Sequence, residues 1–117
     1  MTGLTIETSH LGERAILRLR GSLDAATSKD LDHITRTLAG GEARHIALDC
    51  SELAYLTSAG LKAILEAFLA IRPHGSMLVV ATHDPENMLR FVGMDRLLPV
   101  CSVLPTEWSE GRARNPD

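Results

Sequence analysis

The chain has 117 residues, of which 44% are hydrophobic, and its 12 Lys and Arg against 15 Asp and Glu give a formal charge of −3. This length suits one compact domain with a buried core, and the composition is that of a globular protein, which excludes a disordered or fibrous chain. The acidic excess and the 3% aromatic content provide neither the basic patch nor the stacking platforms of a nucleic-acid binder, so we expect no direct nucleic-acid partner.

The cysteines and the N-terminal segment indicate neither a metal site nor a membrane protein. Cys50 and Cys101 lie in segments with strand character, with no histidine at zinc-ligand spacing, and we expect no cofactor. The first ten residues lack the basic and apolar regions of a signal peptide, and no apolar run approaches the roughly 18 residues of a membrane span. We therefore expect a soluble cytoplasmic protein with reduced cysteines and no membrane span.

The first third of the chain predicts a β-hairpin followed by a helix. Apolar and polar residues alternate over 4–9 and again over 15–20, with a turn between the two segments. Apolar residues at helical spacing follow, Thr27 with Asp30 resembles a capping box at the start of this helix, and Gly40 with its neighbouring glycine ends it.

The middle of the chain predicts a short strand, a loop and a second helix. Residues 45–49 have the pattern of a buried strand of about five residues. A loop then carries the apolar pair Tyr55 and Leu56. Apolar residues repeat at three and four positions from Ser58 onward, until Pro73 stops the helix.

The last third predicts a strand, a helix and an edge strand. Residues 77–81 form the strand, and Asp84 with Pro85 starts the helix, as its cap and first helical residue. Residues 98–103 form the final strand, at the edge of the sheet because Pro99 cannot donate a ladder hydrogen bond. The inner face of the helix is predicted to carry Met88, Leu89, Phe91 and Val92.

The predicted order of elements is β-β-α-β-α-β-α-β. Helices that alternate with buried strands indicate an α/β fold, with a mixed, mainly parallel sheet covered by helices. We assign residues 1–104 to a single domain. Residues 105–117 form a C-terminal tail, which is expected to make a short helical turn around Trp108 or to be disordered.

The most informative residue is Ser58, at the junction of a strand and a helix. Its hydroxyl is expected in the first helical turn, where free backbone N–H groups and the positive end of the helix dipole favour an anion such as phosphate. An equally simple interpretation makes Ser58 the N-cap of the helix. Gly60 costs about 1 kcal/mol relative to Ala in a helix, which indicates that a neighbouring strand or a partner approaches the backbone closely.

The segment around Ser58 resembles the signature of STAS domains of the anti-sigma factor antagonist type. The pattern D-x-S-x-L-x-Y-L-x-S-x-G-L is formed here by Asp49, Ser51, Leu53, Tyr55, Leu56, Ser58, Gly60 and Leu61. Residues 21–24 resemble the G-x-L-D turn of that family, and residues 94–97 resemble its late segment. The similarity covers about residues 4–103 and implies the STAS fold for nearly the whole chain.

The resemblance also implies a function as a partner-switching regulator of bacterial transcription. In this family an unphosphorylated antagonist binds an anti-sigma factor, often a serine kinase with a histidine-kinase-like ATPase fold. Phosphorylation of the serine ends that binding, and a phosphatase restores it. The resemblance makes Ser58 the phosphorylation site of a non-enzymatic protein that is a monomer or weak dimer. The implied partner-binding residues are Asp24, Thr57, Ser58, Ala59, Gly60 and Leu61.

The sequence is also consistent with several alternatives. Thr57 stands where the family often has an acidic residue, which makes Thr57 an alternative phosphorylation site. The domain could instead be an unphosphorylated scaffold or accessory subunit of a larger regulatory or transport assembly, and Asp24 could be an exposed turn or cap residue. An enzyme with Ser58 as nucleophile is disfavoured, because a nucleophile elbow requires Gly two residues before the serine and this chain has Leu56 there.

Overall fold

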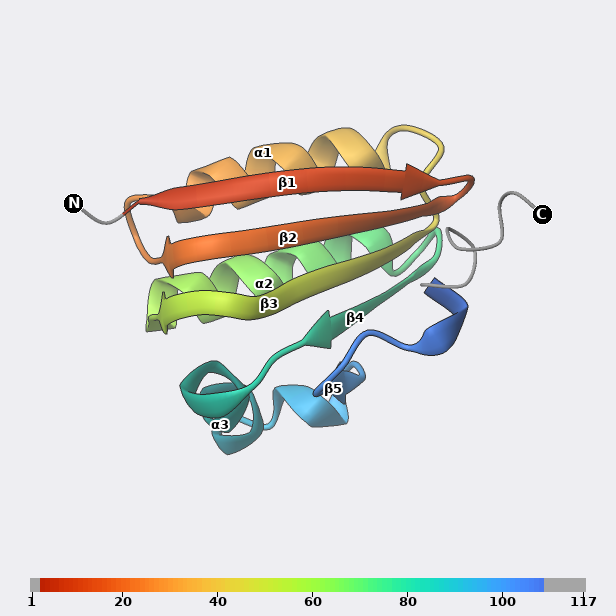
Figure 1. The fold of residues 1–117 in the computed structure, drawn as a ribbon. Helices are drawn as coiled ribbons and strands as arrows, with labels where there is room; N and C mark the ends of the chain where they lie inside the picture. The colour runs from red at the N-terminus through yellow and green to blue at the C-terminus, as the bar shows by residue number, and fades with distance from the viewer. Residues whose placement is uncertain (1–2, 109–117) are drawn as a thin grey trace.

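The computed structural model describes residues 3–108, and these form a five-stranded mixed sheet with the strands in chain order (Figure 1). The first two strands pair antiparallel, and each later strand adds in parallel to its predecessor. The strands are β1 (Leu4–Leu11), β2 (Arg14–Leu23), β3 (His45–Leu56), β4 (Ser76–Val80) and β5 (Val100–Cys101). The helices are α1 (Ser28–Ala39), α2 (Ser58–Ile71), α3 (His83–Phe91) and the short 3-10 helix η1 (Met94–Arg96). The predicted α/β fold and order of elements are confirmed.

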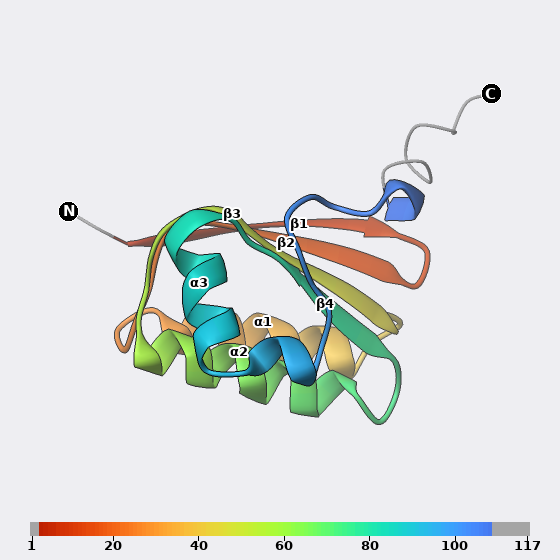
Figure 2. The same cartoon turned by 90° about the horizontal axis from the view of Figure 1, so that it is seen from below.

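The two long helices cover one face of the sheet. Successive parallel strands are added in one direction, and right-handed crossovers between them place the connecting helices on the same side. Figure 2 shows α1 and α2 in one layer below the sheet, and Figure 1 shows α3 near β4 and β5. The core lies between these layers. Its fully buried members include Leu17, Leu19, Leu31, Ile46, Leu48, Ile64 and Leu89.

The strand β3 is much longer than the predicted five residues. Its pairing with β2 shifts twice, between Arg18 and Arg20 and again between Gly21 and Ser22, and each shift leaves an additional β3 residue without a partner. These bulges break the alternation of buried and exposed residues that identifies a strand from sequence. Tyr55 and Leu56, which were expected in a loop, are therefore the last two residues of the strand, paired with Ser22 and Leu23.

The beginning and inner face of α3 differ from the prediction. The helix starts at His83 with Thr82 as its N-cap, two residues earlier than predicted, so Pro85 is its third residue. Leu89 is fully buried as expected, whereas Phe91 is 91% exposed and Val92 is 54% exposed. The buried face of this short helix consists of Pro85 and Leu89, which are four residues apart, and the prediction that Phe91 and Val92 belong to it is wrong.

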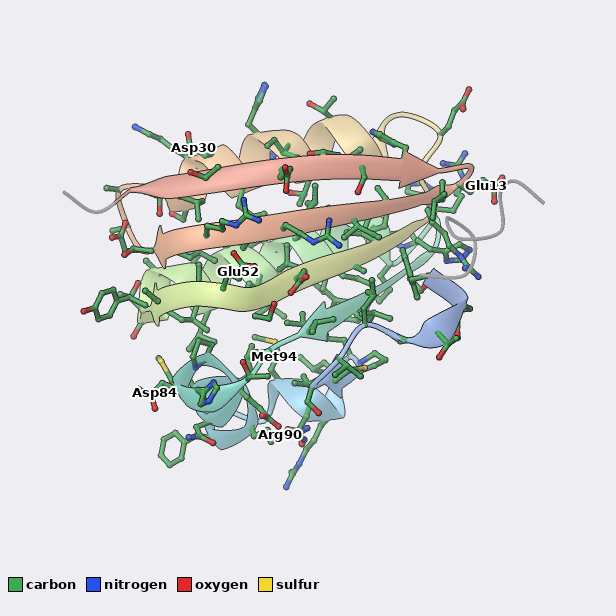
Figure 3. All side chains as sticks on the ribbon, viewed as in Figure 1. Glu13, Asp30, Glu52, Asp84, Arg90 and Met94 are labelled. Carbon is green, nitrogen blue, oxygen red and sulfur yellow. The ribbon has the colours of Figure 1, made fainter. Side chains whose placement is uncertain are left out.

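The face of the sheet opposite α1 and α2 is largely polar, and Figure 3 shows Glu52 on this side. Residues 106–108 form the predicted helical turn, which brings Trp108 against Ile16 and Ala47 in a small second core. The Arg14 guanidinium lies 5.2 Å from the centre of the Trp108 ring. The rest of the predicted tail, residues 109–117, lies outside the described residues, and the domain boundary at 104 stays a prediction.

The final strand is shorter than predicted but occupies the predicted position. It consists of Val100 and Cys101 alone and lies at the edge of the sheet, beside β4. The carbonyl group of Pro99 accepts a hydrogen bond from the Val79 N–H at 3.0 Å, while its own ring nitrogen has no proton to donate. Among residues 3–108, no helix combines the length and apolar character needed to cross a membrane.

Candidate functional site

Ser58 is the first residue of α2 and is exposed. The N-cap is Thr57, whose Oγ1 accepts a hydrogen bond from the Gly60 N–H at 3.3 Å. The interpretation that made Ser58 the N-cap is therefore wrong. Within the described chain, the Ser58 hydroxyl makes no hydrogen bond to another protein group, so it is free to meet solvent or a partner.

A single carbonyl group joins the start of α2 to the end of β2. The Leu23 carbonyl oxygen accepts hydrogen bonds from the Thr57 backbone N–H at 3.1 Å and from Thr57 Oγ1 at 3.3 Å. Gly60 lies directly against the same carbonyl group. A Cβ at position 60 would be 2.8 Å from Leu56 Cδ1 and would clash with the Leu23 oxygen. Of the two predicted reasons for this glycine, the neighbouring strand is the one that the structure supports.

The turn that follows β2 is held together by the Asp24 carboxylate. Its Oδ1 accepts hydrogen bonds from the backbone N–H groups of Ala26 at 3.0 Å and Thr27 at 3.1 Å. Thr27 Oγ1 accepts from the Asp24 N–H and donates to the Ser22 carbonyl oxygen at 2.8 Å. Because Thr27 makes no cap hydrogen bond to the helix, the predicted capping box with Asp30 does not form. Asp24 is half-buried and stabilises this turn, while its contact with a partner stays a prediction.

The Asp24 turn and the start of α2 lie on either side of an open groove between α1 and α2. Ala25 follows Asp24 and Ala59 follows Ser58, and both alanines line the groove, which has a volume of about 290 Å³. Alanines form its apolar part, and two lysines and two acidic residues border it. The eight lining residues are Ala25, Ser28, Lys29, Asp32, Ala59, Lys62, Ala63 and Glu66. An open groove of this kind fits a protein surface better than an enclosed small-molecule site.

The six predicted partner-binding residues differ in exposure. Thr57 and Ser58 are exposed and Ala59 is half-buried, so these three are accessible at the start of α2. Gly60 and Leu61 are buried, facing β2 and the core. Their burial lets them hold the start of α2 against the sheet, while their contact with a partner stays a prediction.

Two further parts of the signature have structural roles on the outer face of β3. Asp49 Oδ1 accepts hydrogen bonds from the Ser51 backbone N–H at 3.0 Å and from the Ser51 hydroxyl at 2.7 Å, at the first bulge. Arg18 forms an ion pair with the same carboxylate at 3.5 Å. Tyr55, beside the second bulge, is 63% exposed and lies near the start of α2 in sequence. Its position in the strand, rather than in the predicted loop, follows from the bulges, which hide the strand pattern in the sequence.

In the described part of the chain, neither the Cys50 thiol nor a cluster of acidic residues forms a chemical centre. Burial raises the pKa of the Cys50 thiol to about 12, so this thiol stays protonated and is a poor nucleophile. Within residues 3–108, no cluster of three or more His, Cys, Asp or Glu side chains is arranged to hold a metal ion.

Comparison with known families decides what kind of domain carries this site. A model of the family described as "Mlab, STAS domain" matches residues 6–99, which is most of the chain. The chain belongs to the STAS domain family. The family and fold that the signature around Ser58 predicted are thus confirmed.

Three solved structures illustrate how widely this STAS fold is shared. An anti-sigma factor antagonist from Mycobacterium paratuberculosis has a TM-score of 0.83 and 18% identity, over 94% of this chain and 95% of that one. The phosphorylated form of the Bacillus cell fate determinant SpoIIAA has a TM-score of 0.66 and 16% identity, over 96% and 100%. The murine anion transporter Slc26a9 has a TM-score of 0.69 and 13% identity, over 97% of this chain but 23% of that one. At these identities the likeness shows the fold.

Proposed function

We propose that this STAS domain is an anti-sigma factor antagonist that binds a serine-kinase anti-sigma factor through the start of α2 and the Asp24 turn. Phosphorylation of Ser58 ends the binding, and a phosphatase restores it. The observation that carries this proposal is the exposed Ser58 hydroxyl, which is not needed to cap the helix because Thr57 is the N-cap. The shared fold with an anti-sigma factor antagonist and with a protein known in a phosphorylated form supports the proposal.

The chemistry of the switch needs no refolding of the domain. In the proposed step, Ser58 Oγ forms a bond to the γ-phosphorus of the kinase's ATP, the bond to ADP breaks, and the hydroxyl proton passes to a base of the kinase. The product carries roughly −1.5 to −2 additional charges and a bulky hydrated group where the partner surface accommodated a hydroxyl. Desolvation and like-charge contacts would then oppose binding, and each loss of about 1.4 kcal/mol lowers the affinity tenfold.

Thr57 is the poorer candidate for phosphorylation. Its hydroxyl already lies within hydrogen-bond distance of the Gly60 N–H and the Leu23 carbonyl oxygen. A phosphoryl group on Thr57 would replace the hydroxyl proton that is donated to the Leu23 carbonyl oxygen, a contact that holds α2 against β2, and would crowd the cap hydrogen bond from Gly60. Modification of Ser58 disturbs neither contact, so we place the switch at Ser58.

The proposal is tested with substitutions at Ser58 and at a serine remote from the site. We expect Ser58→Ala to bind the host's serine-kinase anti-sigma factors with native affinity, and Ser58→Asp to bind at least about tenfold more weakly, measured by titration calorimetry. Ser9→Asp is the matched control, because Ser9 is exposed and pairs with Ile16 near the opposite end of β2. Equal affinities for Ser58→Asp and Ser9→Asp would contradict the switch.

A second function is favoured by two specific observations. Thr57 replaces the acidic residue that often precedes the serine in antagonists, and the same fold occurs as a part of a murine anion transporter. The alternative is a scaffold or accessory subunit of a larger assembly that is never phosphorylated. Mass spectrometry of the protein purified from its host, with phosphatase activity blocked, separates the two functions: an unmodified segment 57–58 under all growth conditions supports the scaffold.

A further inference from the structure

The groove beside Ser58 carries two cationic side chains whose role the proposed switch leaves open. Lys62 lies four residues after Ser58 on α2, and Lys29 faces it from α1 across the groove. In the part of the chain that the structure describes, neither lysine forms an ion pair, whereas Asp32 of the same groove is paired with Arg36 at 3.0 Å. The two ammonium groups are therefore available to an incoming anion.

The spacing of Ser58 and Lys62 brings a modified serine within reach of the lysine. Residues four apart on a helix have Cβ atoms about 5–6 Å from each other, and an acidic group on the N-terminal side of a lysine is the favoured order. A phosphoryl group on Ser58 would be such an acidic group, and it would also lie at the positive end of the α2 dipole.

The charges of the groove are arranged unevenly along its length. Lys62 precedes Glu66 by one turn of α2, and Lys29 precedes Asp32 by one turn of α1, so both lysines lie nearer the helix starts. The carboxylate of Asp32 is already occupied by Arg36. The Asp24 carboxylate beside this end is engaged by the backbone N–H groups of Ala26 and Thr27. The lining next to Ser58 is thus the cationic end of the groove, which is complementary to a partner surface that bears carboxylates.

We propose that Lys62, with Lys29 across the groove, is the shared anion receptor of the switch: it binds a carboxylate of the partner while Ser58 is free, and the phosphoryl group of Ser58 once the serine is modified. This inference rests on the proposed function and deepens it. Phosphorylation then acts twice, because it adds negative charge to the surface and occupies the cations that the acidic partner needs.

The intramolecular half of the proposal can be tested without any partner. Phosphoserine is incorporated at position 58 of the full chain, and the second ionisation of the phosphoryl group is followed by phosphorus-31 NMR. We expect the titration midpoint to rise by roughly 0.3 pH units in Lys62→Gln and to stay native in Lys62→Arg. Arg96→Gln is the control, because Arg96 is an exposed cation of η1, outside the groove. Identical midpoints for the native chain and Lys62→Gln would overturn the inference and leave the proposed function standing.

The predicted contact between Lys62 and a carboxylate of the partner is tested with unphosphorylated protein and the same kinase that is used to test the proposed function. We expect Lys62→Glu to weaken binding about tenfold, Lys62→Arg to bind as the native chain does, and Arg96→Glu to have no effect. If Ser58→Asp abolishes binding while Lys62→Glu binds normally, the receptor role is wrong and the switch survives. If the native chain binds no such kinase, the proposed function itself fails.

Discussion

At the scale of single residues, neighbouring residues at the start of α2 have different roles in the candidate site. Thr57 caps α2 and contacts the Leu23 carbonyl group, which leaves the Ser58 hydroxyl free. Because Gly60 has no Cβ, the first turn of α2 can lie directly against the Leu23 carbonyl group of β2. The backbone of Gly60 is not in the left-handed region. The requirement for glycine at position 60 is therefore steric rather than conformational.

This steric requirement predicts the effect of adding one methyl group. We expect Gly60→Ala to lower the free energy of unfolding by about 1–3 kcal/mol, because the new Cβ collides with the Leu23 carbonyl group and the α2 start must move. Gly40→Ala is the matched control, since a Cβ there would meet its nearest atom at an ordinary 3.6 Å. Urea denaturation of both variants measures the difference, and equal stabilities would refute the explanation.

At the scale of whole elements, α3 shows how little a short helix at a sheet edge can bury. Figure 3 places Asp84 and Arg90 on this helix, at the β4 and β5 side of the molecule. On the exposed side of α3, Arg90 forms ion pairs with Glu86 of the same helix at 3.0 Å and with Asp95 of η1 at 3.4 Å. Leu89 reaches the core, while Phe91 points away from it.

The different burial of Leu89 and Phe91 predicts that replacing them with smaller residues changes the stability by very different amounts. We expect Leu89→Ala to cost about 2–5 kcal/mol, because it leaves a cavity in the core, and Phe91→Ser to change stability by less than about 0.5 kcal/mol. Chemical denaturation followed by circular dichroism provides both values. A large loss in Phe91→Ser would mean that the ring is packed in solution.

At the scale of the whole molecule, the two faces of the sheet are covered by different means. The helices α1 and α2 lie against one face of the sheet (Figure 2), and the side chains that β2 and β3 direct to this face are buried in the core. On the other face, Trp108 packs on Ile16 and Ala47 near the turn that joins β1 to β2, and Arg14 donates a hydrogen bond to the Glu107 carbonyl group at 3.0 Å.

The packing of Trp108 predicts that the segment after β5 contributes to the stability of the whole domain. We expect Trp108→Ala to lower the free energy of unfolding by about 3 kcal/mol, whereas Val103→Ala, in the same segment but 72% exposed, has little effect. Trp108 is the one tryptophan of the chain, so native fluorescence is expected at short wavelength with a red shift on urea unfolding. A native spectrum typical of exposed indole would show that the segment is not docked.

The order of the elements, the extent of α2, the STAS signature and the candidate serine all follow from the amino-acid sequence alone. These features depend on residues that are near one another in the chain: the helical repeat after Ser58, the stop at Pro73 and the spacing from Asp49 to Leu61. Local periodicity and turn chemistry are therefore sufficient to predict them.

How these parts contact one another depends on the folding of the whole chain. The length of β3 depends on bulges that arise from its pairing with β2, and the role of Gly60 depends on the carbonyl group of Leu23, far away in the chain. The exposure of Phe91 depends on what the sheet edge leaves uncovered, and the groove lined by Lys29 and Lys62 depends on the packing of α1 against α2. Each of these features is a contact between distant segments, and such contacts are decided by packing rather than by local propensity.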